Sequence, residues 1–146
     1  MIVMSTVIYN KISLIVIALF SLCNPMNNKT SNECKMCGEW TWEKNDENHD
    51  FNLKIYTEGE YIIGKHCYIT DNGNKMDCST DKNDISFKIK NTNLSNLKVD
   101  FTSFFRGAKG IIEIQLKDNK LIWTVVQKPN DIYYLPLEAV LIKSKN

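Results

Sequence analysis

The stretch IIEIQLKDNKLIWTVV, residues 111–126, carries the pattern that decides the fold. From Ile112 to Leu116, apolar and polar residues alternate, which is the period of a β-strand with one buried face. Asp118-Asn119 follows, and both residue types accept the backbone of a tight hairpin turn. The run Leu121–Val126 is apolar on both faces, as in a strand that is covered on two sides. The stretch therefore predicts a β-hairpin.

The same two-residue period recurs on both sides of this hairpin. It predicts strands over 38–43, 50–57, 60–69, 75–79, 84–90, 97–105, 110–117, 120–127 and 138–143. Short connections, among them Glu58-Gly59 and Asn72-Gly73, make neighbours in the sequence neighbours in the sheet. Pro129 and Pro136 interrupt the period before the last strand. We therefore predict an all-β fold, an antiparallel up-and-down meander of eight or nine strands that closes into a barrel.

The N-terminal segment has a different character. Lys11 precedes Ile12–Leu22, an apolar run that is short beside the roughly 20 residues needed to span a bilayer. A positive charge, a short apolar core and a small residue after it are typical of a secretory signal. We predict a helical signal peptide over 1–23, a flexible tether over 24–36 and a single β-barrel domain over 37–146. An uncleaved N-terminal anchor is the alternative.

Two cleavage reactions stay open. Ser21 and Cys23 are small residues at the −3 and −1 positions for an ordinary signal peptidase. Alternatively, Leu19–Cys23 resembles a bacterial lipobox, with Leu22 in place of the usual Gly or Ala, and Cys23 would then carry the lipid. Both reactions predict an exported protein, located in the periplasm, in the cell envelope or outside the cell. Membrane contact is expected only through the signal or the lipid.

The charge balance excludes one class of partner. The chain has 18 Lys and Arg against 17 Asp and Glu, and one of the lysines falls in residues 1–23, which contain no acidic residue. The remainder is balanced, so it has no long-range field that would attract nucleic acid. With 43% hydrophobic and 24% charged residues, the composition is that of a folded chain.

Four cysteines follow residue 23, and in an exported chain they favour two disulfides. Counting outward from the Asn72-Gly73 turn pairs Cys67 with Cys78, at a cross-strand distance within disulfide reach. With a two-residue turn, this count makes them a hydrogen-bonded pair. Cys34 and Cys37 pair by elimination. A redox-active C-x-x-C and a zinc site of four sulfurs are the alternatives.

Gly38-Glu39-Trp40, a G-x-W at the start of a β-meander, resembles the first strand of lipocalins and of the wider calycin group of small barrels. In that group the Trp closes the barrel floor, and the resemblance implies that Lys143 or Arg106 packs over it. The chain is also similar to small uncharacterised exported proteins of Gram-negative bacteria. The residues shared with them near the C-terminus are Trp123, Pro129, Tyr134, Pro136, Ala139 and Leu141. The resemblance implies a compartment and a small barrel, without an activity.

Six aromatic residues of the predicted strands are candidates to line a cavity for a small ligand. They are Trp40, Trp42, Tyr61, Phe87, Phe101 and Trp123. An eight-stranded barrel is either filled by its side chains or holds one small ligand. We predict a monomeric, non-catalytic protein without a cofactor that binds a small apolar ligand. The alternative is an envelope-tethered protein-interaction module, an inhibitor or adaptor, that contacts its partner through the loop 104–110.

No residue pattern points to catalysis or to a metal. His66 lies beside Cys67 on a strand, so the two side chains point to opposite faces, and a small hydrolase would need Cys67 as a free thiol. His49 falls in the polar stretch 44–50, which reads as a loop. Asp77, Asp81 and Asp84 lack the spacing of a metal site and fit turns better.

Overall fold

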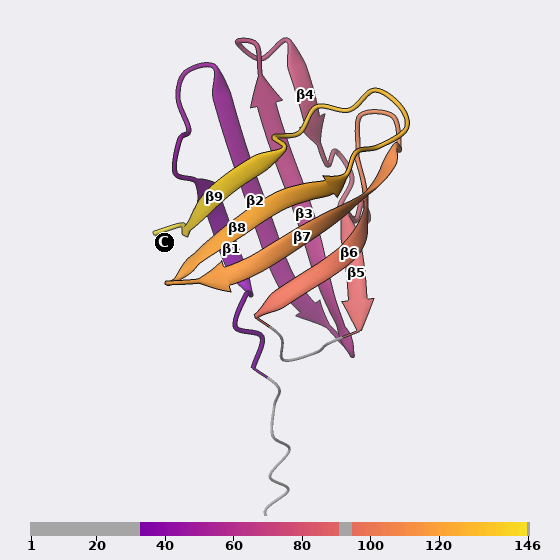
Figure 1. Cartoon of the computed structure of the whole chain (residues 1–146). Coiled ribbons are helices and arrows are strands. Elements are labelled where there is room, and N and C mark those ends of the chain that lie inside the picture. The colour runs from indigo at the N-terminus through magenta and orange to yellow at the C-terminus, as the bar shows by residue number, and fades with distance from the viewer. Residues whose placement is uncertain (1–32, 91–94, 146) are drawn as a thin grey trace, which may run out of the picture. The chain divides into compact units, whose positions relative to one another are not determined.

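Nine β-strands form one antiparallel sheet in the computed structural model, which describes residues 33–90 and 95–145 (Figure 1). The strands are β1 (Gly38–Trp42), β2 (His49–Glu58), β3 (Tyr61–Thr70), β4 (Lys75–Cys78), β5 (Phe87–Lys90), β6 (Asn96–Thr102), β7 (Lys109–Lys117), β8 (Lys120–Gln127) and β9 (Glu138–Lys143). Within the described residues, no helix has the length and hydrophobicity needed to cross a bilayer. The predicted signal segment, Cys23 and the tether up to residue 32 lie outside the described residues.

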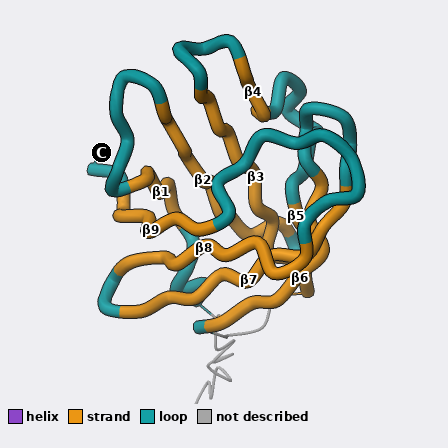
Figure 2. The backbone as a smooth tube through the Cα atoms, turned by 45° about the horizontal axis from the view of Figure 1, so that its top comes forward, coloured by secondary structure: helices purple, strands orange, loops and turns teal. Residues whose placement is uncertain are grey.

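The sheet is ordered β4-β3-β2-β1-β9-β8-β7-β6, and β5 pairs with the N-terminal half of β3. Strands β1 to β4 and β6 to β9 each pair with their neighbours in the sequence, and β9 returns to pair with β1. The predicted pairing of sequence neighbours is wrong at β5, which pairs with β3 and with neither β4 nor β6. Strands β1–β4 form one layer, and β6–β9 cross in front of it (Figures 1 and 2). The predicted all-β antiparallel meander of eight or nine strands is confirmed, as a curled half-barrel.

The two ends of the curled sheet meet where β5 approaches β6, a line that we call the seam. Ser86, just before β5, connects both sides of it. Its backbone N–H donates to Gly64 O at 2.8 Å on β3, and its carbonyl accepts the N–H of Thr102 at 2.8 Å on β6. A single residue therefore bridges strands that do not form a continuous ladder among the described residues.

The interior of the half-barrel is filled by aromatic and aliphatic side chains. Trp123 is fully buried, and its ring packs edge-on against Phe51 and Phe101, with centroids 5.2 and 5.9 Å apart. Phe87 lies over Gly64, its register partner, at the seam. A Cβ atom added to Gly64 would lie 2.0 Å from the Phe87 ring, so this position requires glycine for space.

Trp40 of the G-x-W segment is buried in the core of the half-barrel. The indole N–H of Trp40 donates to Met36 O at 2.8 Å. Lys143 is the register partner of Trp40 on β9, and its Nζ lies 5.5 Å from the centroid of the Trp40 ring. Lys143 thus packs over Trp40, as the lipocalin resemblance implied for Lys143 or Arg106. Arg106 lies in the β6–β7 loop, where its Nη1 atom is 4.0 Å from Oδ1 of Asp131.

Both expected disulfides are present, Cys34–Cys37 and Cys67–Cys78. The predicted two-residue turn between β3 and β4 is wrong, because residues 71–74 all belong to the turn and Asp71 already has a positive φ of 55°. The longer turn exchanges the hydrogen-bonded and non-hydrogen-bonded residue pairs along the β3–β4 ladder. Cys67 and Cys78 remain register partners, but their Cα atoms are 4.0 Å apart, the short spacing of a non-hydrogen-bonded pair.

Candidate functional site

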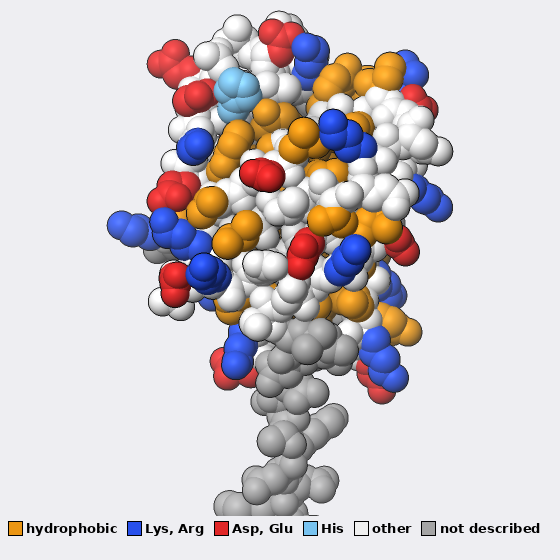
Figure 3. Space-filling view, in the orientation of Figure 1, with side chains coloured by type: hydrophobic (Ala, Val, Ile, Leu, Met, Phe, Trp, Pro, Cys, Tyr) orange, Lys and Arg blue, Asp and Glu red, His pale blue; other side chains and the backbone are white. Residues whose placement is uncertain are grey.

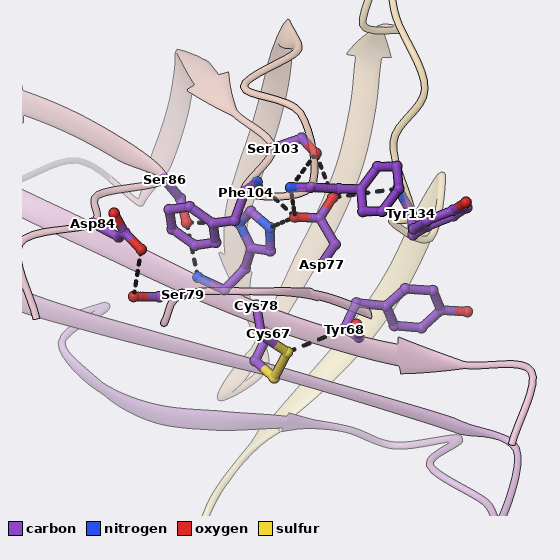
Figure 4. A network of polar contacts seen from close by, with 12 residues as sticks. Cys67, Tyr68, Asp77, Cys78, Ser79, Asp84, Ser86, Ser103, Phe104 and Tyr134 are labelled. Atoms are coloured by element: carbon purple, nitrogen blue, oxygen red, sulfur yellow. Dashed lines mark hydrogen bonds and ion pairs between the residues drawn. A yellow bond between two sulfur atoms is a disulfide. The ribbon is translucent and has the colours of Figure 1, made fainter. Parts of the chain in front are cut away.

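A cluster of four buried polar side chains lies at the seam. It consists of His66, Asp77, Ser86 and Ser103, whose exposed fractions are 1%, 0%, 2% and 0%. We call it the Asp77 cluster (Figure 4). His66 and Asp77 reach the interior because they stand next to Cys67 and Cys78 on β3 and β4, and neighbouring residues on a strand face opposite sides.

The carboxylate of Asp77 is the acceptor at the centre of the cluster. Its Oδ1 atom accepts from the ring Nε2 of His66 at 2.9 Å and from the backbone N–H groups of Phe104 and Phe105 at 2.6 and 3.2 Å. Its Oδ2 atom accepts from the Ser103 hydroxyl and, at 3.3 Å, from the backbone N–H of Tyr134. Five donors from three separate parts of the chain therefore converge on one buried carboxylate.

His66 connects the carboxylate to Ser86, which lies at the seam. Its Nδ1 atom lies 2.6 Å from Ser86 Oγ, which also accepts the backbone N–H of His66 at 2.8 Å. The ring of Phe104 stacks on the imidazole, with centroids 4.5 Å apart and planes inclined by 20°. An imidazole with its proton on Nε2 donates to Asp77 and accepts the Ser86 hydroxyl proton, so each polar atom of the ring has a partner.

The donors around Asp77 determine its ionisation. Burial alone would raise the pKa of this carboxyl group. The hydrogen bonds from His66, from the Ser103 hydroxyl and from the Phe104 N–H act in the opposite direction, and together they hold the pKa below its ordinary value of 3.8. Asp77 is therefore an ionised group in the interior that is compensated by hydrogen bonds.

The order Ser86–His66–Asp77 is that of a nucleophile, a base and an orienting acid. The hydroxyl of Ser86 is 2% exposed, however, and already accepts the backbone N–H of His66. A substrate would reach this oxygen only if the seam opened. In the arrangement observed, the cluster holds the β6–β7 loop and the β8–β9 connection in place through hydrogen bonds to Asp77.

The loops held by Asp77 present an exposed group of side chains, which we call the loop patch. It consists of Phe105, Arg106, Asp131, Ile132 and Tyr134. The rings of Phe105 and Tyr134 are tilted against each other with centroids 4.4 Å apart, and the Arg106 guanidinium carbon lies 5.6 Å from the Phe105 centroid. Phe105 and Ile132 are 40% and 48% exposed. In Figure 3, hydrophobic side chains gather over the β8–β9 connection at the upper right of the view.

The six aromatic residues predicted to line a cavity occupy three different environments. Four of them, Trp40, Phe87, Phe101 and Trp123, are at most 2% exposed and belong to one packed core. Tyr61 lies on the surface, where the Nζ of Lys88 is 4.2 Å from its ring centroid. Trp42 is partly buried at one end of β1.

Trp42 belongs to a second aromatic group that sequence reasoning did not assemble. Its ring meets those of His49 and Tyr68 at centroid distances of 6.4 and 6.3 Å, and His49 stacks on Tyr68 at 6.5 Å. His49 also lies 3.2 Å from the Asp46 carboxylate. His49 is therefore the edge of an aromatic group, and its place in a polar stretch of sequence gave no sign of this.

Two hollows lie against the sheet. One, with a volume of about 260 Å³, lies across β1, β2 and β3. The other, of about 420 Å³, lies against β6, β7 and the end of β8. Among the described residues, no three His, Cys, Asp or Glu side chains are grouped so that they could hold a metal ion.

The Asp77 cluster was missed in the sequence, where Asp77 was assigned to a turn. A usable signal existed, since the predicted pairing of Cys67 with Cys78 places His66 and Asp77 together on the opposite face of the hairpin. Ser86 and Ser103 gave no signal of their own. Comparison of the chain with protein-family models, with curated proteins and with solved structures finds no match in any of the three.

Proposed function

We propose that this chain is an exported, non-catalytic β-barrel protein of lipocalin-like fold that binds a protein partner through the loop patch. The observation that carries the proposal is the attachment of both loops to Asp77. Phe104 and Phe105 precede β7, Tyr134 precedes β9, and all three backbone N–H groups donate to the same carboxylate. The patch is therefore held in one arrangement before any partner arrives.

The composition of the loop patch supports this function. Aromatic residues and arginine are the types that contribute most of the binding energy in protein interfaces. Phe105 and Tyr134 are in contact, and Arg106 lies against Phe105, so three such side chains form one group. Because their loops are already ordered, binding avoids part of the entropy cost, which is about 0.5–1.5 kcal/mol for each side chain that must be immobilised.

The export part of the proposal is supported by the two disulfides. Structural disulfides persist in oxidising compartments such as the periplasm and the cell exterior. Together with the predicted signal over 1–23, they favour release from the cytosol, with Cys23 either removed or lipidated. A lipid on Cys23 would present the domain at an envelope surface on the tether 24–36.

A site-specific crosslink tests the binding function. A photoreactive phenylalanine derivative is placed at Phe105 in the full chain, expressed in its own host, and at Tyr61 as the matched control. Tyr61 is equally exposed, at 41%, but lies on β3 away from both loops. We expect one defined protein adduct from position 105 that is absent from position 61 and is lost on Tyr134→Ala. Identical adducts from both positions, or none from position 105, would contradict the function.

Binding of a small apolar ligand is a second candidate, supported by the group of Trp42, His49 and Tyr68. Trp42 and His49 are partly exposed and offer aromatic surface at one end of the interior. Native mass spectrometry of protein purified from its host would report a retained ligand. The ligand is expected to be lost on Trp42→Ala and kept on Tyr61→Ala. Protein that carries no added mass would contradict this candidate.

A further inference from the structure

We propose that the Cys67–Cys78 disulfide is a thiol-exchange site. The thiolate of a dithiol reductant enters the 260 Å³ hollow and attacks Cys67 from there, and reduction of the disulfide loosens the loop patch. The chemical step depends on the hollow and the residues that line it. Its consequence for partner binding rests on the proposed function.

The hollow opens beside Cys67, one of the two residues of the disulfide. It is lined by Glu39, Trp40, Asn52, Leu53, Lys54, Lys65, His66, Cys67, Ser79 and Ser144. His66 is buried on the interior face, and Cys67 is its neighbour on β3, so the Cys67 side chain faces outward, on the side of Lys65. The disulfide is partly exposed, whereas Asp77 on the same hairpin is fully buried. Figure 4 shows the disulfide and the Asp77 carboxylate on opposite sides of the hairpin.

The position of the hollow matches the direction of attack. A thiolate displaces a sulfur of a disulfide along the S–S axis, from the side opposite the leaving sulfur. Cys78 lies on β4 and Cys67 on β3, and the next strand in the sheet is β2. Asn52 of β2 is the register partner of Cys67 and lines the hollow, so the hollow lies on the side of Cys67 away from the strand of Cys78. Attack from this side breaks the bond with Cys78 as the leaving group.

Lys65 provides positive charge beside this path, whereas the charge of Lys54 is paired with Glu39. Lys65 and Lys54 are register partners on β3 and β2, and both line the hollow. Lys54 Nζ lies 2.7 Å from Glu39 Oε1, and Lys65 Nζ donates to the carbonyl of Lys82. Both side chains are held by these contacts, and positive charge near a disulfide favours the approach of a thiolate.

The proposed step is balanced with a dithiol as reductant. The first thiolate forms a bond to Cys67 Sγ, and the electron pair of the S–S bond leaves on Cys78, which takes up a proton. The second thiol of the reductant, as its thiolate, then attacks the first sulfur of the reductant in the mixed disulfide, and Cys67 leaves as a thiolate that takes up a proton. The protein gains two thiols, and the dithiol is oxidised to its cyclic disulfide.

Reduction acts on the loop patch because Cys78 is adjacent to Asp77. The disulfide is the covalent link between β4, a strand of four residues, and β3. Without it, Asp77 is held in place only by the short ladder and by its own hydrogen bonds. The N–H groups of Phe104, Phe105 and Tyr134 depend on that carboxylate, so the two loops lose order when β4 moves away from β3.

Reduction kinetics of the oxidised full chain test the exchange site. Samples are treated with increasing dithiothreitol, quenched in acid and alkylated, and the cysteines are identified by peptide mapping. We expect the reduction rate of Cys67–Cys78 to rise in proportion to dithiothreitol while the circular dichroism signal stays native. A rate that is independent of dithiothreitol, as when global unfolding limits reduction, would overturn the proposal.

The direction of attack has its own test. With glutathione in place of dithiothreitol and a rapid acid quench, the first adduct is expected on Cys67. Lys65→Gln should slow this step by about threefold, the effect of one charge about 7 Å away in a water-like medium. Lys98→Gln, an exposed lysine on β6, is the control and should leave the rate unchanged. First adducts on Cys78, or equal rates in both variants, would overturn attack from the hollow.

Amide hydrogen exchange tests the consequence for the loops without any partner. In the reduced protein, the amides of Phe104, Phe105 and Tyr134 should exchange at least tenfold faster, whereas those of β7 and β8 keep their protection. Unchanged exchange at the three amides would overturn the switch. Loss of crosslinking at position 105 in the oxidised protein would instead count against the proposed function, so the two failures are distinguishable.

Discussion

The Oδ2 atom of Asp77 accepts the backbone N–H of Tyr134 at 3.3 Å, although 57 residues separate the two in the sequence. The bond joins β4, at one end of the sheet order, to the connection between β8 and β9. The other oxygen of the same carboxylate binds the loop that follows β6, at the other end of the sheet order. One buried side chain thus joins the two ends of the curled sheet, where strand pairing does not.

Replacing Asp77 by asparagine is expected to destabilise the fold. The amide oxygen of Asp77→Asn retains the acceptor for His66, Phe104 and Phe105, but its NH₂ group faces the N–H of Tyr134, and two donors then oppose each other. A buried donor left without an acceptor costs about 1–3 kcal/mol. Urea unfolding should therefore show a lower midpoint with an unchanged slope. Asp100→Asn, at an exposed position of β6, is the control and should shift the midpoint little.

The contribution of Asp77 to stability should depend on pH. Its folded pKa lies below the ordinary value of 3.8, so its stabilising effect is complete above that pH and is lost as the pH falls through the lower folded value. The difference in unfolding free energy between the wild type and Asp77→Asn is expected to be constant from about pH 5 to 7 and to narrow below about pH 4. The measurement is urea unfolding of both proteins over this range.

A difference that stays constant down to about pH 2.5 would contradict this ionisation of Asp77. Two surface carboxyl groups, Asp46 and Glu113, also have lowered pKa values. A hydrogen bond from the backbone of Asn48 lowers the pKa of Asp46, and one from the Asn96 side chain lowers that of Glu113. Both groups are present in the two proteins compared, so their titration cancels in the difference.

Gly64 and Phe87 should be strongly coupled. In Gly64→Ala, the new methyl group would lie 2.0–2.6 Å from three atoms of the Phe87 ring, so the ring must leave its buried position. We expect a loss of about 2–4 kcal/mol in unfolding free energy. The same change in a Phe87→Leu background should cost less, because the smaller side chain leaves room. A double-mutant cycle by urea unfolding measures the coupling, and a value near zero would contradict the packing described.

The strand pattern and the Cys67–Cys78 disulfide were predictable from local sequence. Alternation of apolar and polar residues identifies a strand wherever one face is buried, so all nine strands were placed. The errors lie where tertiary contacts override this pattern. The strand predicted over 97–105 ends at Thr102, because Ser103, Phe104 and Phe105 turn away from the sheet to donate to Asp77.

The Asp77 cluster was not predictable as a site, because its members come from four separate segments of the chain. Only His66 and Asp77 were related by a predicted strand pair. Contact with Ser103 and Tyr134 depends on how the whole sheet curls, and no local pattern encodes that curvature. Trp42 and His49 were missed for a different reason: they lie at the adjoining ends of β1 and β2, but the polar stretch around His49 indicated a loop.

The contact of Lys143 with Trp40 should be separable into a packing part and a charge part. The stem of Lys143 lies against Gly38, where a Cβ atom would be 2.8 Å from its Cε, and its Nζ lies over the Trp40 ring. Lys143→Met keeps an apolar stem of similar length and removes the charge, so it should lose only the cation–π interaction, about 0.5–1 kcal/mol at an exposed site. Lys143→Ala removes both parts and should cost more. Lys145→Met, just beyond β9, is the control and should leave the unfolding midpoint unchanged.

Unfolding midpoints in which Lys143→Met equals the wild type while Lys143→Ala is lower would assign the stabilisation to the stem alone. Equal losses in both variants would assign it to the charge.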